Sequence, residues 1–280
     1  MDNSMSLSLL DDWLIRNWSA SPEEYRWLIL QTMATAASRR QWIISWPAIA
    51  DGILFDLGCG PGIVSQEIAT LKSTAVVGYD QDPHALEIGQ NIDRLCRGPF
   101  PVKFRLGNIL DDFNQDPGDG ACVRFVAQYA ENLGWFMESV KKRIKPGGFV
   151  AVEDIDDGLF VEYPEPPQAW QHIVAAFRKH QSGRFGDRYV GRKLCQAGID
   201  VGLKVLEMSV NPSASQGMTE RDDLSVQFDI DRLKQALPSL IQAGALTERE
   251  WYDGLSEYRS SFPRRIFTSN ATIRVLFEVP

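Results

Sequence analysis

Phe55-Asp56-Leu57-Gly58-Cys59-Gly60-Pro61-Gly62 is a glycine-rich stretch that follows the apolar run Ile53–Leu57 and precedes a helical pattern. Glycine adopts backbone angles that other residues avoid, and it lets a ligand approach the main chain closely. Such a turn between a strand and a helix is typical of nucleotide-binding sites in α/β proteins. A tight turn without a ligand is the alternative, but three glycines within five residues favour a binding site.

Short apolar runs alternate with helical patterns between about residues 53 and 153. This alternation predicts βαβ units and a parallel sheet, so we expect a doubly wound α/β fold. An alternating pattern also predicts a strand near residue 280, in which Ile273, Val275 and Phe277 share one face. The predicted strands are Ile53–Leu57, Ala75–Asp80, Val102–Leu106, Ala121–Phe125, Phe149–Glu153 and Thr272–Val279.

Helical patterns surround this predicted sheet. We expect residues 1–50 to form an N-terminal helical arm, and residues 51–280 to form the core with helical insertions at about 157–190 and 211–265. Ser21-Pro22-Glu23-Glu24 predicts a helix capped by the Ser21 hydroxyl, and Thr247-Glu248-Arg249-Glu250 predicts a capping box. These additions are expected to cover a binding site as lids.

The composition, with 44% apolar and 24% charged residues, is that of an ordinary globular protein. Acidic residues outnumber basic ones by 37 to 29, which argues against a nucleic-acid partner because such proteins need a basic surface. The 4 cysteines lie far apart without a CxxC pair, which disfavours a zinc ribbon or a disulfide framework and suits a reducing compartment. We find no export signal and no spanning segment, and we expect a cytoplasmic protein without a membrane partner or a metal site.

Two features of the glycine turn distinguish between ligands. The dinucleotide fingerprint is GxGxxG, whereas here the glycines run GxGxG and Ile63 occupies the place of the last one. Asp56 lies beside the turn, and a carboxylate there would repel a pyrophosphate but attract an ammonium or a sulfonium. We therefore expect a nucleoside that carries positive charge.

The same stretch, FDLGCGPG, resembles the glycine motif of the class I S-adenosylmethionine-dependent methyltransferases. Other motifs similar to those of this family follow in the family's order, and the resemblance covers about residues 52–155. Five motifs in the right order make the resemblance specific. The others are Val76–Asp80, Gly107-Asn108-Ile109, Asp119–Tyr129 and Arg143–Gly148.

The resemblance implies a Rossmann-like, mostly parallel sheet of seven strands with an antiparallel last strand. It also implies S-adenosylmethionine as cofactor and S-adenosylhomocysteine as product. In the family, the acid that corresponds to Asp80 holds both ribose hydroxyls, and Asn108 replaces an acid that accepts from the adenine amino group, so a weaker bond is expected there. The residues that the resemblance places at the cofactor are Asp56, Gly58, Cys59, Gly60, Gly62, Asp80, Gln81, Asn108, Ile109 and Arg124.

Signals for catalytic residues are weaker. Tyr129 stands where many relatives have His, so a base would have to come from elsewhere. Glu153 ends a predicted strand, at the edge where open α/β sheets bind ligands, and His172 lies in the helical pattern that follows. We take Glu153 and His172 as candidate catalytic residues; an exposed position on a helix is the alternative for His172.

The function that we predict is in-line methyl transfer from S-adenosylmethionine to a small-molecule acceptor, at an O, N or C atom that the sequence does not identify. Neither nucleic acid nor membrane is expected as a partner, and the oligomeric state is left open, a homodimer included. The first alternative is a protein of the same fold that binds the cofactor without transferring methyl. A nicotinamide oxidoreductase and a protein-interaction module are weaker alternatives, because neither explains the GxGxG turn.

Overall fold

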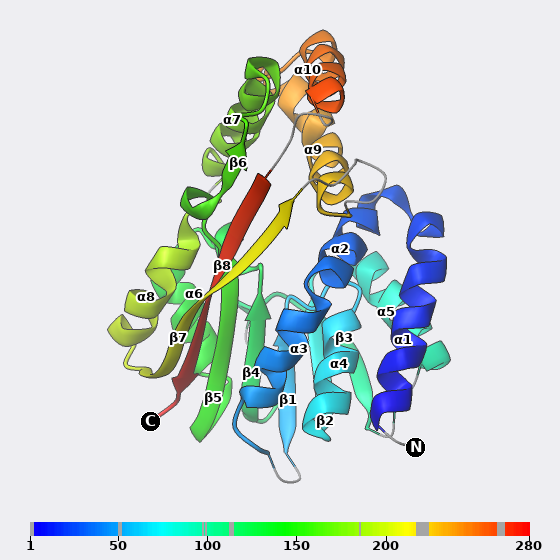
Figure 1. Cartoon of the computed structure of the whole chain (residues 1–280). Coiled ribbons are helices and arrows are strands. Elements are labelled where there is room, and N and C mark those ends of the chain that lie inside the picture. Colours follow the sequence, from blue (N-terminus) through cyan, green and yellow to red (C-terminus); the bar gives the residue numbers. More distant parts are fainter. Residues whose placement is uncertain are drawn as a thin grey trace.

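A mixed sheet lies at the centre of the computed structural model, which describes residues 3–49, 52–96, 98, 100–111, 115–184, 186–216, 224–261 and 267–280 (Figure 1). Its strands are β1 (Ile53–Leu57), β2 (Ala75–Asp80), β3 (Val102–Leu106), β4 (Gly118–Arg124), β5 (Ile144–Ile155), β6 (Val161–Tyr163), β7 (Lys204–Gln216) and β8 (Phe267–Glu278). In the described ranges these eight strands follow the order β3-β2-β1-β4-β5-β8-β6, and β7 pairs with β8. The strands β1 to β5 are parallel to one another, and β8 is antiparallel to its partners β5, β6 and β7.

The predicted doubly wound α/β fold is confirmed. β1, β2 and β3 have the predicted bounds, whereas β4 begins at Gly118 and ends at Arg124. The end differs because Phe125 leaves the strand with a φ of 58°. The start differs because Gly118 already pairs with Ile144 of β5 across a register shift. β5 (Ile144–Ile155) extends beyond Phe149–Glu153 at both ends, and β8 (Phe267–Glu278) begins before Thr272 and ends one residue before Val279. The short strand β6 lies in the insertion at about 157–190 that was expected to be helical, and β7 extends to Gln216, into the one expected at about 211–265. The sheet has eight strands where seven were expected.

Helices cover both faces of the sheet. Leu54 of β1 packs with α3 and α4 on one face, and Phe55 and Leu57 pack with α6 and α8 on the other, because successive side chains of a strand point to opposite sides. The described helices are α1 (Asn3–Asn17), α2 (Glu23–Ala34), α3 (Ala36–Ser45), α4 (Ile63–Lys72), α5 (Pro83–Cys96), α6 (Leu133–Lys141), α7 (Gln168–Ser182), α8 (Leu194–Asp200), α9 (Leu224–Gln242) and α10 (Glu248–Ser261), with 3-10 turns at Trp18–Ala20, Ala127–Tyr129, Asp157–Leu159 and Val190–Lys193.

The helices α7, α9 and α10 form a layer of their own above the carboxyl ends of the parallel strands (Figure 1). Trp170 of α7 and Tyr258 of α10 stack in its apolar core with 4.0 Å between ring centroids. The N-terminal helix α2 packs along α9. Segments from both ends of the chain therefore meet over the same edge of the sheet, and we call α2, α7, α9 and α10 the lid helices.

The two predicted helix caps have different outcomes. The capping box before α10 is present, because Glu250 N donates to Thr247 Oγ1 at 3.2 Å and Thr247 N donates to Glu250 Oε2 at 2.8 Å. The predicted Ser21 cap is wrong, because the Ser21 hydroxyl turns back and donates to the carbonyl oxygen of Asn17, the last residue of α1. Among the described helices, none has both the length and the apolarity that a membrane span requires.

Candidate active site

A cavity of about 810 Å³ lies at the carboxyl ends of β1, β2, β4 and β5. Residues that follow these strands line one part of the cavity, and residues of the lid helices line the rest. Ligands of open α/β sheets bind at this edge, because the loops that follow the strands can diverge there. The cavity therefore joins the predicted cofactor residues to the helical additions.

The glycine turn forms the wall of the cavity at the N-terminus of α4. Gly58, Gly60 and Gly62 all have positive φ angles, of 78°, 50° and 68°, which L-residues rarely adopt. A Cβ atom on Gly58 would lie 2.3 Å from Val126, and one on Gly62 would lie 2.3 Å from Phe104. A Cβ atom on Gly60 would have no neighbour within 4 Å. Gly58 and Gly62 are thus needed for packing, whereas Gly60 leaves open space in the cavity.

The position of Gly62 differs from the other two glycines. Gly58, Cys59 and Gly60 line the cavity, and Gly62 does not, since it begins α4 against Phe104. Cys59 is 8% exposed, and burial together with the Asp56 carboxylate raises the pKa of its thiol well above the ordinary value. A reactive thiolate is therefore disfavoured at Cys59.

Asp80 organises the loop after β2. Its Oδ2 accepts the N–H of Gly60 at 2.7 Å, and its Oδ1 accepts the N–H of Asp82 at 3.0 Å. The adjoining Gln81 and Asp82 also line the cavity. Tyr25 of the lid helix α2 donates from its hydroxyl to Asp82 Oδ2 at 2.7 Å. The loop after β2 and the lid helix α2 are thus held together at the edge of the cavity.

Asp56 lines the cavity at the end of β1, although its side chain is only 2% exposed. Ser65 of α4 donates from its hydroxyl to Asp56 Oδ2 at 2.6 Å. Burial raises the pKa of Asp56 to about 6, the nearby Asp80 carboxylate adds to this rise, and the Ser65 hydrogen bond opposes it. A cation that entered the cavity would lower this pKa, because it would favour the ionised carboxylate.

Asn108 and Ile109 lie in the loop after β3, and both line the cavity. Asn108 Oδ1 accepts the N–H of Leu110 at 2.9 Å, so this side chain shapes the loop. Ile109 is 8% exposed and packs in the core cluster on the α6 face of the sheet. The structure thus brings the predicted cofactor residues Asp56, Gly58, Cys59, Gly60, Asp80, Gln81, Asn108, Ile109 and Arg124 to one cavity.

Glu153 lies behind the cavity and does not line it. It is fully buried, and three groups donate to it: Arg124 Nε at 2.7 Å, Arg274 Nε at 2.9 Å and the Thr272 hydroxyl at 2.7 Å. Although burial alone would raise the pKa of Glu153, the guanidinium groups of Arg124 and Arg274 outweigh it and hold the pKa below the ordinary value. The position of Glu153 does not support a role as a proton acceptor.

His172 lies on the outer face of α7, where its side chain is 55% exposed. Its Nε2 is 3.7 Å from Glu250 Oε1 of α10, and it does not line the cavity. The structure therefore does not bring the two candidate catalytic residues together. The described residues also contain no group of three or more His, Cys, Asp or Glu side chains that could hold a metal ion.

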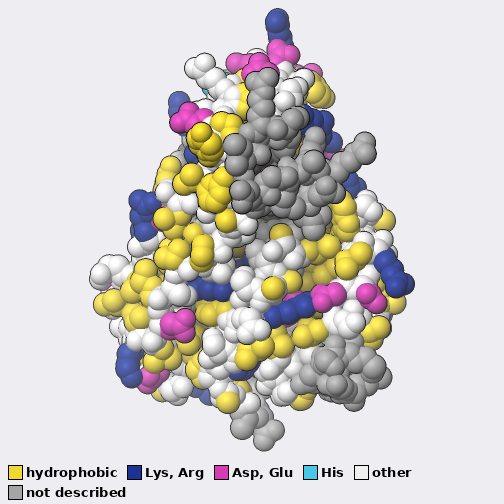
Figure 2. All heavy atoms as spheres, in the orientation of Figure 1, with side chains coloured by type: hydrophobic (Ala, Val, Ile, Leu, Met, Phe, Trp, Pro, Cys, Tyr) yellow, Lys and Arg dark blue, Asp and Glu magenta, His cyan; other side chains and the backbone are white. Residues whose placement is uncertain are grey.

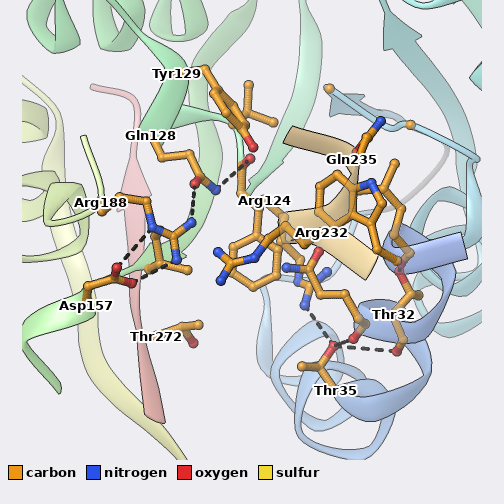
Figure 3. A pocket seen from close by; sticks show the side chains of 18 of the residues that line it. Thr32, Thr35, Arg124, Gln128, Tyr129, Asp157, Arg188, Arg232, Gln235 and Thr272 are labelled. Atoms are coloured by element: carbon orange, nitrogen blue, oxygen red, sulfur yellow. Dashed lines mark hydrogen bonds and ion pairs between the residues drawn. The ribbon is translucent and has the colours of Figure 1, made fainter. Parts of the chain in front are cut away.

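Several cavity residues were not predicted (Figure 3). Thr35 follows α2 and accepts from Arg124 Nη2 at 2.8 Å. Tyr129 is 57% exposed, and this exposed surface faces the cavity. Gln128 and Tyr129 had a signal in the sequence, because both belong to the fourth-strand motif Asp119–Tyr129. The other unpredicted cavity residues labelled in Figure 3 are Thr32, Asp157, Arg188, Arg232, Gln235 and Thr272.

Comparison with known proteins identifies the family. A family model described as a methyltransferase domain matches residues 50–212. The ribosomal protein L11 methyltransferase of Listeria innocua is 28% identical over 135 residues, which are 44% of this chain and 42% of that protein. The chain spans about half the length of the curated relatives that it matches.

Solved structures share the fold. Geranyl diphosphate C-methyltransferase from Streptomyces coelicolor A3(2) is similar with a TM-score of 0.53 and 16% identity, over 91% of this chain and 84% of that chain. The [4+2]-cyclase SpnF is similar with a TM-score of 0.55 and 14% identity, over 88% of this chain and 82% of that chain. The family match covers more than half of the residues of this chain. The protein therefore belongs to the class I S-adenosylmethionine-dependent methyltransferases.

Proposed function

We propose that the protein transfers the methyl group of S-adenosylmethionine to a small-molecule acceptor. The observation that carries this proposal is that one continuous cavity of about 810 Å³ extends from the glycine turn to the lid helices. Its volume lies in the upper part of the range for ligand sites, and it can hold a nucleoside together with a second small molecule. The residues at its two ends suit these two occupants.

The residues around the glycine turn fit the cofactor. Gly60 leaves open space, and the Asp56 and Asp80 carboxylates lie at two neighbouring strand ends. A ligand with an amino group, a sulfonium and a ribose supplies the cations and hydroxyls that such carboxylates attract. We propose that Asp80 accepts hydrogen bonds from the ribose hydroxyls and that the Asp56 carboxylate attracts the positively charged part of the cofactor. We also propose that Asn108 and Ile109 lie against the adenine.

S-adenosylmethionine supplies an electrophilic methyl group, and the leaving group is already good. The chain's part is therefore to bring the acceptor atom to the methyl group and to exclude water. The lid helices suit this role, because Trp170, Phe177 and Tyr258 line the acceptor part of the cavity with aromatic surface. We assign Glu153 a positioning role toward Arg124, and we assign no proton transfer to His172.

Several observations support a small acceptor rather than a nucleic acid. The formal net charge is −8, and on the face shown in Figure 2 the Lys and Arg side chains are interspersed with Asp and Glu. A phosphate backbone requires a continuous basic surface. The four cysteines are free, which supports the proposal of a reducing, cytoplasmic location.

Calorimetric titration with S-adenosylmethionine tests cofactor binding, and conversion to S-adenosylhomocysteine with a panel of small acceptors tests transfer. We expect saturable binding at micromolar concentration and turnover with at least one acceptor class. Folded protein that does not bind S-adenosylmethionine would refute the proposal. Binding without turnover across the panel would favour the alternative in which the same fold uses the cofactor site without methyl transfer.

A further inference from the structure

We infer that the acceptor is a small organic anion whose carboxylate or phosphate group binds between Arg188 and Arg232, next to the ring of Phe177. This inference rests on the proposed function, because it names the class of acceptor for the same cavity. Two guanidinium groups and an aromatic surface lie side by side in this part of the cavity.

Arg188 and Arg232 come from distant parts of the chain and meet at one ring. Arg188 precedes the 3-10 turn Val190–Lys193, and Arg232 lies on the lid helix α9. Their guanidinium carbons are 5.7 Å and 5.1 Å from the centroid of Phe177 on α7. Figure 3 shows the two side chains extending toward one another across the cavity. This convergence places two cations where a ligand can contact both.

Two carboxylates, Asp157 and Asp229, contact the guanidinium groups around this pair. Asp157 accepts from Arg188 Nη2 at 2.8 Å and from Arg178 Nε at 2.6 Å, so one carboxylate serves two cations. Arg232 Nη2 has Asp229 Oδ1 at 2.9 Å. Burial lowers the pKa of Arg232, and repulsion by Arg188 lowers it further. An anion between the two arginines would relieve both effects.

Other acids also line the cavity. Asp156 is bound by Arg192, whose Nε lies 2.6 Å from Asp156 Oδ2. Glu131 and Glu162 line the cavity as well, and the Asp229 and Asp157 carboxylates oppose the lowering of the pKa of Arg232. An anion bound by the pair would therefore share the guanidinium donors with Asp157 and Asp229.

The donors of Arg188 are pre-positioned for an oxyanion. Asp157 holds its Nε and Nη2, and Gln128 Oε1 accepts from its Nη1 at 3.2 Å. These contacts use three of the five N–H donors of a guanidinium, so donors remain for a ligand. A planar guanidinium matches the paired oxygens of a carboxylate or a phosphate, which a lysine would not do equally well.

The surroundings of the pair suit the rest of such a molecule. Phe177, Trp170 and Tyr258 line the same cavity and can contact an apolar or aromatic body. Tyr129 lines the same cavity and brings a hydroxyl to this surface. The proposed cofactor residues lie at the carboxyl ends of β1, β2, β3 and β4, whereas Arg188 and Arg232 come from other elements. An acceptor anchored by its anion would thus present a different atom to the methyl group.

The test measures binding of sodium benzoate and of inorganic pyrophosphate by calorimetry, with and without S-adenosylhomocysteine. The variants are Arg232→Gln, Arg188→Gln and the charge-preserving Arg232→Lys, and Arg105→Gln on the exposed edge strand β3 is the matched control. We expect at least one anion to bind the wild type and Arg105→Gln equally. Arg232→Gln should weaken this binding about tenfold to a hundredfold, as for loss of a hydrogen bond to a charged group. Arg232→Lys should recover only part of it, and affinity for S-adenosylhomocysteine should stay within about twofold in all variants.

The outcomes separate the inference from the proposed function. Binding of benzoate alone supports a carboxylate anchor, and binding of pyrophosphate alone supports a phosphate anchor. A wild type that binds S-adenosylhomocysteine but neither anion overturns the inference and leaves the function intact. Equal anion affinity in Arg232→Gln and the wild type also overturns it. Anion binding without any S-adenosylhomocysteine binding supports the anion site and refutes the function. Arg188→Gln is interpreted only with an unchanged circular dichroism spectrum, since Arg188 also holds Asp157.

Discussion

Arg124 and Glu153 lie opposite one another in the neighbouring strands β4 and β5, with 2.7 Å between Arg124 Nε and Glu153 Oε2. Glu153 also neutralises Arg274 from β8, and Arg124 reaches Thr35 beyond α2. A carboxylate near the carboxyl end of a central strand of this fold is a natural candidate for a base. Here its charge is used to hold two arginines within the sheet, one of which lines the cavity.

Glu153→Gln should therefore destabilise the protein rather than remove a catalytic group. Removing one partner of a buried ion pair costs about 3–5 kcal/mol, because the other charge stays buried without compensation. We expect this loss in the free energy of unfolding measured with urea. Exposed Glu87→Gln on α5 is the control and should be neutral. Wild-type stability combined with abolished turnover would restore a catalytic role for Glu153.

Asp80→Asn should weaken S-adenosylmethionine binding about tenfold to a hundredfold, because a charged acceptor for the ribose hydroxyls is lost. The loop should persist, since the Asn oxygen can still accept from Gly60 N or Asp82 N. Calorimetric titration measures the affinity, and exposed Glu87→Gln again serves as the charge control. Unchanged affinity in Asp80→Asn would refute the ribose role.

Binding of S-adenosylmethionine should strengthen about tenfold between pH 5 and pH 7. Asp56 has a pKa of about 6 in the free protein, so its carboxylate is mostly protonated at pH 5 and mostly ionised at pH 7, where it attracts the cation. Titrations across this range should show the rise in the wild type. Asp56→Asn should bind weakly and with little pH dependence. A wild-type affinity that is constant over this range would contradict the assignment.

The Asp56 carboxylate should affect the stability of the ligand-free protein in the opposite direction: rising pH strengthens cofactor binding but lowers the free energy of unfolding. Because the folded-state pKa of Asp56 is raised to about 6 from the ordinary value of 3.8, the folded protein binds more protons than the unfolded chain between these values. The contribution of Asp56 to stability therefore falls as pH rises through this window. At pH 7 and without ligand, Asp56→Asn should stabilise the protein by about 1–3 kcal/mol in urea unfolding. Destabilisation at pH 7 would show that the Ser65 hydrogen bond dominates.

Gly60→Ala should separate cofactor binding from stability. The new methyl group meets no protein atom within 4 Å, but it would occupy space in the cavity. The positive φ of 50° at Gly60 costs about 1–2 kcal/mol with Ala. Gly244→Ala is a matched control, because Gly244 has a φ of 65°, no neighbour within 4 Å and no place in the cavity. We expect similar losses of stability in both variants and loss of S-adenosylmethionine binding only in Gly60→Ala.

Local patterns in the sequence were sufficient for the bounds of β1, β2 and β3 and for the residues at one end of the cavity, whereas β6 and β7 were not predicted. β1, β2 and β3 have the predicted bounds, because apolar runs bounded by turn residues act over short distances. Phe125 was placed in β4, although it leaves the strand with a φ of 58°. The hydroxyl of Ser21 was assigned to a cap, although it bonds backward to Asn17. These errors lie at element ends, where neighbouring segments compete for the same donors and acceptors.

The sequence by itself determined that a glycine turn lies beside carboxylates at two neighbouring strand ends, where we propose the site for a cationic nucleoside. This follows because the turn, its strand and its helix are contiguous, and parallel strands bring their carboxyl ends to one edge. Only the tertiary structure decided that Glu153 forms ion pairs with two arginines and that His172 lies outside the cavity. It also decided that Arg188 and Arg232 meet at Phe177. Their partners are far apart in the chain, so their roles depend on how lid and sheet pack together, which no local pattern records.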